Sequence, residues 1–361
     1  MVCISIFVSC PQQLTVILQH GVKRQRPELR DPEDVQRAKA AKERARIDEY
    51  TALRAQLSLL ASRAKEEHSV EALDLTTRIL ERNPEFPTGW SFRRRIFLKG
   101  LFKGADEQAI QTLLEGDLDL TVRCFKRNPK DYSVWEHRKW VLRTMPDPDW
   151  RYELQTAEGM LERDARNYHA WDYRRYVVSS ILNAPAPPPR STRKPLHPTT
   201  SSELAYTSGK IAASFSNFSA WHHRSKLLAK LWEEQGLDAT DPARLKRIDQ
   251  EFELVKQALY TDPDDQSAWI YHRWLVGQGR EGVLKREIQV IEELTELEPE
   301  SKWCLESLVQ YGNRLIDLQQ DNPDTAELRQ KCKTRLETLQ RVDPLRRIRY
   351  AQLSDTTVDK V

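Results

Sequence analysis

One recurring pattern constrains the fold of this chain more than any other feature: a Trp stands a few residues after a polar turn, and a basic residue usually follows three positions later. The turn is of the Asn-Pro, Asp-Pro or Asn-Tyr type. Successive copies lie 45, 36, 50, 48 and 34 residues apart, and periods of this size are typical of arrays of stacked helical hairpins. The repeat tryptophans are Trp90, Trp135, Trp171, Trp221, Trp269 and, in a degenerate copy, Trp303.

Each copy is predicted to contain two helices, because the Pro of the turn disfavours the α conformation of the residue before it. The sequence therefore predicts an all-α fold, an α-α superhelix in which each hairpin buries its apolar face against its neighbours. The first helices are expected at 70–82, 117–127, 151–163, 203–215, 246–260 and 284–297. The second helices are expected at 88–98, 132–143, 168–182, 218–232, 266–276 and 302–318. A long charged helix over 31–67 precedes them, and a last helix follows over about 325–341.

The domain organisation predicted from this pattern is simple. Residues 1–30 are expected to form a disordered N-terminal extension, and residues 31–355 a single helical repeat domain. The widest interval between two tryptophans contains a Pro-rich insert, residues 185–202, which is expected to be an exposed loop between hairpins.

Composition and motifs exclude several classes of function. The net charge is +3, from 57 basic and 54 acidic residues, so nothing demands a nucleic acid partner. The five Cys, at positions 3, 10, 124, 304 and 332, form no CxxC pair and indicate free thiols of a reducing, cytoplasmic compartment. No apolar run is long enough to span a bilayer. The chain also contains no phosphate-binding Gly-rich loop, no HExxH motif and no nucleophile elbow, which favours a binding surface over a self-sufficient enzyme.

The repeat Trp and Arg residues have two readings. They could form a stacking platform for bases or lipids, but their spacing favours an architectural role, with each Trp between hairpins and each Arg paired with a carboxylate or a helix end. The turn residues Lys130, Tyr132, Asn167 and His169 lie in equivalent connections. Because equivalent turns line up in a solenoid, they could form one polar strip, although solvated loops would give the same pattern.

The repeats resemble those of the protein prenyltransferase alpha subunits, whose motif is Asn-Tyr/Pro followed by Trp-x-x-Arg. The resemblance covers about residues 20–355. It is strongest to the Rab geranylgeranyltransferase (type II) branch, on four segments: 20–24 (His-Gly-Val-Lys-Arg), 261–274, 298–305 and 342–350.

The resemblance implies a crescent of hairpins wrapped around a catalytic beta subunit that holds zinc and most of the lipid pocket. The heterodimer would transfer geranylgeranyl from its diphosphate to C-terminal Cys residues of a Rab GTPase presented by a Rab escort protein. This chain would bind no cofactor alone. Lys130 matches the family Lys that reaches the lipid diphosphate, where an ammonium offsets charge on the leaving group. His169 would act with Lys130 in catalysis, and Asn167 and Tyr132 would line the same pocket.

His20 is the one candidate on this chain for contact with the partner's zinc. The family begins Met-His-Gly, whereas Gln19 precedes His20 here. Either the start lies elsewhere or this autoinhibitory contact is lost.

Two alternatives remain at this stage. The chain could be the alpha subunit of CaaX farnesyltransferase and geranylgeranyltransferase type I, although the segments 261–274 and 298–305 weigh against it. It could also be a non-enzymatic, tetratricopeptide-like scaffold. That repeat keeps a period near 34 and a different motif, which the variable spacing and Trp-x-x-Arg contradict.

Overall fold

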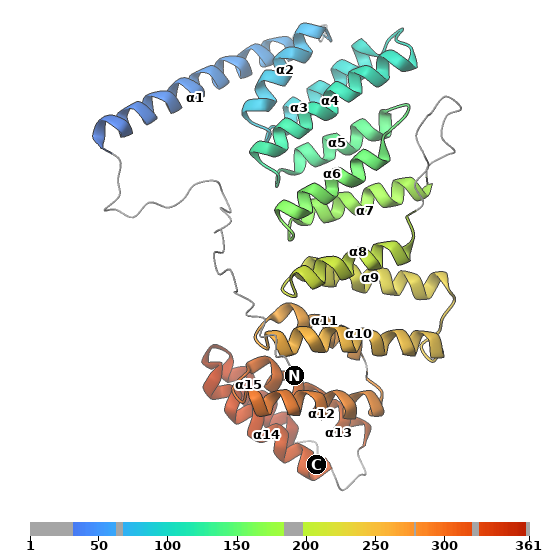
Figure 1. Cartoon of the computed structure of the whole chain (residues 1–361). Helices are drawn as coiled ribbons and strands as arrows, with labels where there is room; N and C mark the ends of the chain where they lie inside the picture. The colour runs from blue at the N-terminus through green and yellow to red at the C-terminus, as the bar shows by residue number, and fades with distance from the viewer. Residues whose placement is uncertain (1–31, 63–67, 184–197, 278, 320–324, 359–361) are drawn as a thin grey trace, which may run out of the picture. The chain divides into compact units, whose positions relative to one another are not determined.

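A computed structural model describes residues 32–62, 68–183, 198–277, 279–319 and 325–358, and within these ranges the regular structure is helical, without a strand (Figure 1). The all-α fold predicted from the repeats is therefore confirmed. Contacts divide the chain into two compact units, residues 1–141 and 142–361. The crescent stays a prediction.

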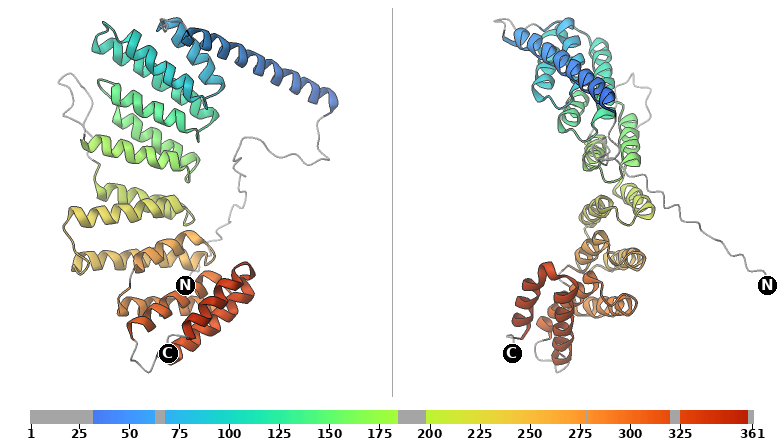
Figure 2. Two further views of the ribbon diagram at one scale, coloured as in Figure 1. Left: turned by 180° about the vertical axis from the view of Figure 1, so that it is seen from behind. Right: turned by 90° about the vertical axis from the view of Figure 1, so that its left-hand side faces the viewer.

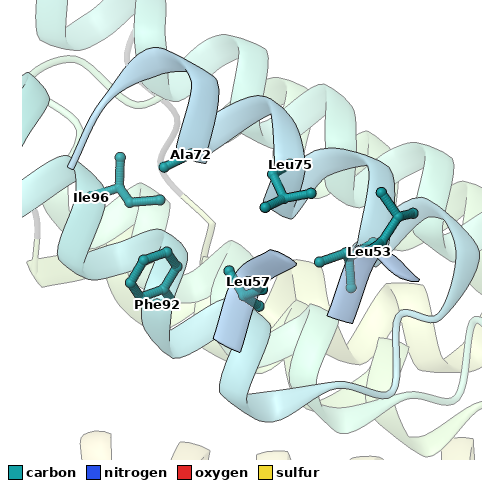
Figure 3. Close-up of a cluster of buried hydrophobic side chains, with 7 residues drawn as sticks. Leu53, Leu57, Ala72, Leu75, Phe92 and Ile96 are labelled. Atoms are coloured by element: carbon teal, nitrogen blue, oxygen red, sulfur yellow. The ribbon is translucent and has the colours of Figure 1, made fainter. Parts of the chain in front are cut away.

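The first unit begins with the long helix α1 and continues with the first repeat hairpins. Its elements are α1 (Glu33–Ser62), α2 (Val70–Arg82), α3 (Pro87–Ile96), η2 (Phe97–Leu101), α4 (Glu107–Arg127) and the greater part of α5 (Tyr132–Thr144). The apolar stripe of α1 is buried against the first hairpin. Figure 3 shows Leu53 and Leu57 of α1 facing Leu75 of α2 and Phe92 of α3, all of which are buried. This seam fixes α1 to the start of the repeat array.

The second unit contains the remaining repeats and the C-terminal helices. Its elements are α6 (Trp150–Arg163), α7 (Tyr168–Asn183), α8 (Thr200–Ala213), α9 (Phe218–Glu234), α10 (Pro242–Thr261), α11 (Gln266–Val276), α12 (Glu281–Leu297), α13 (Lys302–Leu318), α14 (Thr325–Val342), η3 (Pro344–Arg346) and α15 (Arg347–Val358). Consecutive helices at its C-terminal end pack side by side (Figure 2).

Several helix boundaries differ from the sequence prediction; α10, for example, begins at Pro242 instead of residue 246, because the Asp241 side chain caps its first turn. Helix α4 begins at Glu107 instead of residue 117, because the Asp106 side chain caps its first turn by accepting the Ala109 N–H at 2.7 Å. Helix α8 begins at Thr200, inside the predicted Pro-rich loop, where Thr199 and Ser202 form a capping box. The predicted second helix at 88–98 ends earlier as an α-helix and continues as the wider turn η2.

Helix α15 was missed by the sequence analysis, which ended the last helix at about residue 341. It is held by Tyr350, which packs against Leu305, Leu336 and Leu339 of α13 and α14. The Tyr350 hydroxyl also lies 2.7 Å from a Glu306 oxygen and 2.9 Å from an Asp343 oxygen, and its one proton can be donated to either carboxylate. Helix α15 is therefore held by the buried Tyr350, with Leu353 packed against the same cluster.

Some predictions fall on other parts of the chain. Two predicted segments lie outside the described residues: the N-terminal extension 1–30 and residues 185–197 of the Pro-rich insert. The first of them includes His20, Cys3 and Cys10.

Candidate functional site

The repeat tryptophans are buried, and their indoles form hydrogen bonds with the turns between helices. In the first five copies, from Trp90 to Trp269, the indole Nε1–H donates to the backbone carbonyl six residues earlier, which lies in the turn between the two helices of the hairpin. The distances run from 2.7 Å, for Trp221 to Phe215 and for Trp269 to Pro263, to 3.0 Å, for Trp171 to Ala165. Side chains buried in this way cannot serve as a stacking platform, so the architectural interpretation is confirmed.

Asn and Asp side chains shape the same turns at both ends. The residue after the first helix accepts the N–H two positions on, as in Asn128 to Lys130 and Asp164 to Arg166, both at 3.1 Å. The residue before the second helix caps that helix: Asp131 accepts the Ser133 N–H at 2.8 Å. The spacing from the turn to the Trp is therefore fixed by the two side-chain hydrogen bonds at the ends of the turn and by the hydrogen bond of the Trp indole to the turn carbonyl.

Lys130 and Tyr132 share the turn between α4 and α5 in the first unit. The backbone N–H of Lys130 donates to the Asn128 side chain at 3.1 Å. Lys130 itself is exposed on this turn. Tyr132 opens α5 and is 66% exposed. Both predicted residues can therefore meet a ligand or a partner at this surface.

Asn167 and His169 share the turn between α6 and α7 in the second unit. Asn167 is buried, and its Oδ1 accepts the backbone N–H of His169 at 3.0 Å and of Ala170 at 3.3 Å, so it caps α7. The buried His169 ring lies 4.0 Å from the ring of Tyr168. The structure thus brings the four residues together as two pairs, one per unit, and the single polar strip stays a prediction.

A buried ionic cluster lies behind the turns of the first unit. The Nε–H of Arg93 on α3 donates to Asp117 on α4 at 2.5 Å. The Nη1–H groups of Arg93 donate to the Thr76 hydroxyl at 2.8 Å and to the Leu73 carbonyl at 3.0 Å, both on α2. The His137 ring lies 2.6 Å from the second Asp117 oxygen. Burial opposes ionisation, yet Arg93 and His137 hold the pKa of Asp117 below its usual value. Burial also lowers the pKa of His137.

The second unit repeats this arrangement. Arg224 donates two hydrogen bonds to Glu251 of the next repeat, at 2.6 and 2.8 Å, and the Tyr271 hydroxyl donates to the same carboxylate at 2.8 Å. Arg174 and Glu203 form an equivalent pair at 2.9 and 2.7 Å. Each of these arginines therefore ties its own hairpin to the next one; the sequence predicted a carboxylate or helix-end partner, and the structure shows a carboxylate of the following hairpin.

The acidic partners of the arginines were not identified from the sequence. A recognisable signal is present, because in four repeats a buried acid stands eighteen residues before the repeat Trp. The copy at Trp269 has His272 three positions later, in place of Arg. His272 makes the corresponding contact with an acid of the next hairpin, and its Nε2 lies 2.9 Å from Glu287. The four acids are Asp117, Glu153, Glu203 and Glu251.

The described thiols and carboxylates show no metal centre. Cys124, Cys304 and Cys332 are buried free thiols, and burial raises the pKa of Cys332 to about 11. Within the described ranges, no three His, Cys, Asp or Glu side chains gather as a candidate metal site. The helices of the same ranges include none with the length and apolarity to cross a bilayer.

Known proteins match both the repeats and the whole chain. The family model described as "Protein prenyltransferase alpha subunit repeat" matches residues 69–100, 114–145, 150–181, 200–231 and 248–279. The geranylgeranyl transferase type-2 subunit alpha of Schizosaccharomyces pombe is 36% identical over 353 residues, covering 93% of this chain and 98% of that protein. The chain belongs to the protein prenyltransferase alpha subunit family.

Further relatives refine this membership. The geranylgeranyl transferase type-2 subunit alpha of Candida albicans is 32% identical over 375 residues, covering 92% of this chain and 96% of that protein. The Mus musculus protein of the same name is 36% identical over 208 residues, 57% of this chain and 34% of its own length. The type-2 names of the two near-full-length relatives place the chain in the type-2 group, as the four sequence segments predicted.

The fold of the family is seen in a solved structure. A chain of the Candida albicans protein geranylgeranyltransferase-I complexed with GGPP superposes with a TM-score of 0.63, at 21% identity, covering 86% of this chain and 91% of that chain. At this identity the likeness concerns the fold alone.

Proposed function

We propose that this prenyltransferase alpha subunit works in a heterodimeric Rab geranylgeranyltransferase. The dimer transfers geranylgeranyl from its diphosphate to C-terminal Cys residues of Rab GTPases presented by a Rab escort protein. The observation that carries the proposal is the identity of 36% along almost the whole length of a type-2 alpha subunit. The buried free thiols are compatible with a reducing, cytoplasmic compartment.

The proposed share of this chain is electrostatic. Lys130 lies on an exposed turn, where its ammonium can reach a diphosphate held mainly by the beta subunit. Charge that grows on the leaving diphosphate in the transition state is offset by such a fixed cation. Tyr132 offers a phenol on the same turn, and the pair of Asn167 and His169 is proposed to line the same pocket from the next repeat turn. Zinc is proposed to belong to the beta subunit, where it favours the thiolate form of the acceptor Cys.

Co-expression tests the proposal. The full chain is produced with a Rab-type beta subunit and, separately, with a CaaX-type beta subunit. Each preparation is scored for a 1:1 complex and for lipid transfer to a Rab–escort complex. A stable, active pair with only the Rab-type subunit is the expected result. Pairing with only the CaaX-type subunit would move the function to the sister enzyme, and pairing with neither would leave a helical scaffold.

A further inference from the structure

A chain of hydrogen bonds leads from α1 through two repeat turns to the backbone of Lys130. The hydroxyl of Tyr50 on α1 accepts a 2.9 Å hydrogen bond from the side chain of Asn83, which directly follows α2. The Oδ1 atom of Asn83 accepts the backbone N–H of Glu85 at 3.1 Å, within the first repeat turn. The Glu85 carboxylate accepts a hydrogen bond from the side-chain amide of Asn128 in the second repeat turn. The Oδ1 atom of Asn128 accepts the backbone N–H of Lys130 at 3.1 Å.

Asn128 is the residue that joins the two turns. Its Oδ1 atom accepts the N–H of Lys130 and its Nδ2 group donates to Glu85, so both ends of one amide are used. Asp164 and Asp262 stand at the same position of the third and fifth turns, and each accepts the equivalent N–H at 3.1 Å. An ionised carboxylate has no hydrogen to donate, so these two residues cannot form the second bond. Among these three turns, a side-chain amide link to the preceding turn is therefore a property of the one that carries Lys130.

The link fixes the backbone from which the Lys130 side chain projects. The carbonyl of Pro129 accepts the indole of Trp135 at 2.9 Å, which fastens the turn to α5. The bond from Asn128 to Glu85 fastens the same turn to the preceding repeat. A displacement of about 1 Å at a reacting group can slow a reaction by about a hundredfold. An exposed carboxylate in the preceding repeat can therefore influence a step in which it takes no direct part.

We propose that Glu85 is a positioning residue for the transfer reaction. It orients Asn128 and, through Asn128, the turn that presents Lys130 to the lipid diphosphate. The inference rests on the proposed function, which gives Lys130 its role. Glu85 does not touch the reacting atoms, and its contribution is the hydrogen bond that it accepts.

The charge of Glu85 has the opposite effect from its hydrogen bond. Burial raises the pKa of Asp131, and the negative charge of Glu85 raises it further, so this charge is felt in the turn of Lys130. A negative charge at that turn opposes the binding of a diphosphate. If charge were the main effect of Glu85, neutralising it would favour the reaction, whereas loss of the hydrogen bond is expected to slow it.

Two substitutions of Glu85 separate the hydrogen bond from the charge. Glu85→Gln removes the charge and keeps an oxygen that can accept from Asn128, whereas Glu85→Ala removes both. The matched control is Asp264→Ala, because Asp264 is an exposed acid at the same position of the fifth turn, with its N–H bonded to Asp262 at 3.1 Å. Each full-length variant is assembled with the Rab-type beta subunit. Single-turnover transfer to a Rab–escort complex is then measured at saturating geranylgeranyl diphosphate.

Glu85→Ala is expected to slow single-turnover transfer by about three- to thirtyfold, while Glu85→Gln and Asp264→Ala stay within about twofold of the original rate. In a Lys130→Ala background, Glu85→Ala is expected to cause no further loss, because it acts through Lys130. Hydrogen exchange of the backbone amide of Lys130 is expected to be faster in Glu85→Ala than in Glu85→Gln.

A normal rate for Glu85→Ala would overturn the proposal, as would an equal loss in Glu85→Gln or a further loss in the Lys130→Ala background. Faster transfer by both Glu85 variants would also overturn it and leave only the effect of charge. If the unmodified chain shows no transfer with the beta subunit, the proposed function itself fails. Hydrogen exchange then still tests the link between the turns, and an unchanged exchange rate in Glu85→Ala would exclude it.

Discussion

Glu251 on α10 receives both guanidinium hydrogen bonds of Arg224 on α9, at 2.6 and 2.8 Å. Both side chains are buried. The pair therefore links two neighbouring hairpins through buried charges, and losing Glu251 leaves the Arg224 guanidinium without its carboxylate partner in the interior.

Glu251→Ala is expected to lower the free energy of unfolding by about 3–5 kcal/mol, because it strands the buried Arg224 charge. Urea unfolding followed by circular dichroism measures this change. Glu281→Ala is the control, since Glu281 pairs with Lys285 on the surface at 2.8 Å with both side chains about half exposed. A change of less than about 1 kcal/mol is expected there. Equal losses in the two variants would contradict the assignment.

Lys130→Ala is expected to leave the heterodimer intact and to slow the transfer step by about one to three orders of magnitude, through lost stabilisation of charge on the leaving diphosphate. Single-turnover transfer measures the step. Arg166→Ala is the matched control, because Arg166 is also basic, exposed and at the same position of an equivalent turn. A normal rate for the Lys130 variant would remove this residue from the site.

Asn167 is predicted to have a structural role that can be separated from any role in the pocket. Asn167→Ala removes the cap of α7 and is expected to lower the free energy of unfolding by about 1 kcal/mol. Asn167→Asp keeps a capping oxygen and is expected to stay close to the original stability. Thermal unfolding of the isolated chain distinguishes the two. If Asn167→Asp is stable but slows transfer, the amide itself contributes to the pocket.

The stability of the chain is expected to fall as the pH is lowered below about 6.5. Burial lowers the pKa of His137 in the folded chain from its ordinary 6.5, so the unfolded chain takes up a proton on this residue first. The contribution is complete above pH 6.5 and is lost progressively towards the lower folded pKa. Urea unfolding near neutral and mildly acidic pH should show a smaller loss for His137→Gln. An identical loss in both proteins would assign the pH dependence to other groups.

Gly312→Ala is expected to destabilise the chain, although Ala is the better helix former. A Cβ at position 312 would lie 2.6 Å from the Sγ of the buried Cys332, so α13 and α14 would have to separate. A loss of about 1–3 kcal/mol is expected for such overpacking. The double variant Gly312→Ala/Cys332→Ala should recover part of it. Failure of the second substitution to help would place the strain elsewhere.

Much of the fold could be predicted because the repeat is written in local signals. Turn residues, Pro and helical periodicity gave α2, α11 and α13 their observed bounds. Helix α4 was underestimated because its first half lies far from the repeat Trp, and α15 was missed because it depends on packing of Tyr350 and Leu353 against α13 and α14. The site followed the same division: Lys130, Tyr132 and Asn167 stand out by their turns, whereas the burial of Asn167 and His169 depends on the packing of helices.

The sequence by itself determined the hairpins, their turns and the family, since these depend on backbone propensities and on a motif confined to about ten neighbouring residues. Only the tertiary structure decided which carboxylate each repeat Arg meets. Partners such as Arg93 and Asp117 are 24 residues apart and lie in different hairpins. Packing of one hairpin on the next brings them together, and burial then makes the ion pair obligatory, because an unpaired charge in the interior is too costly.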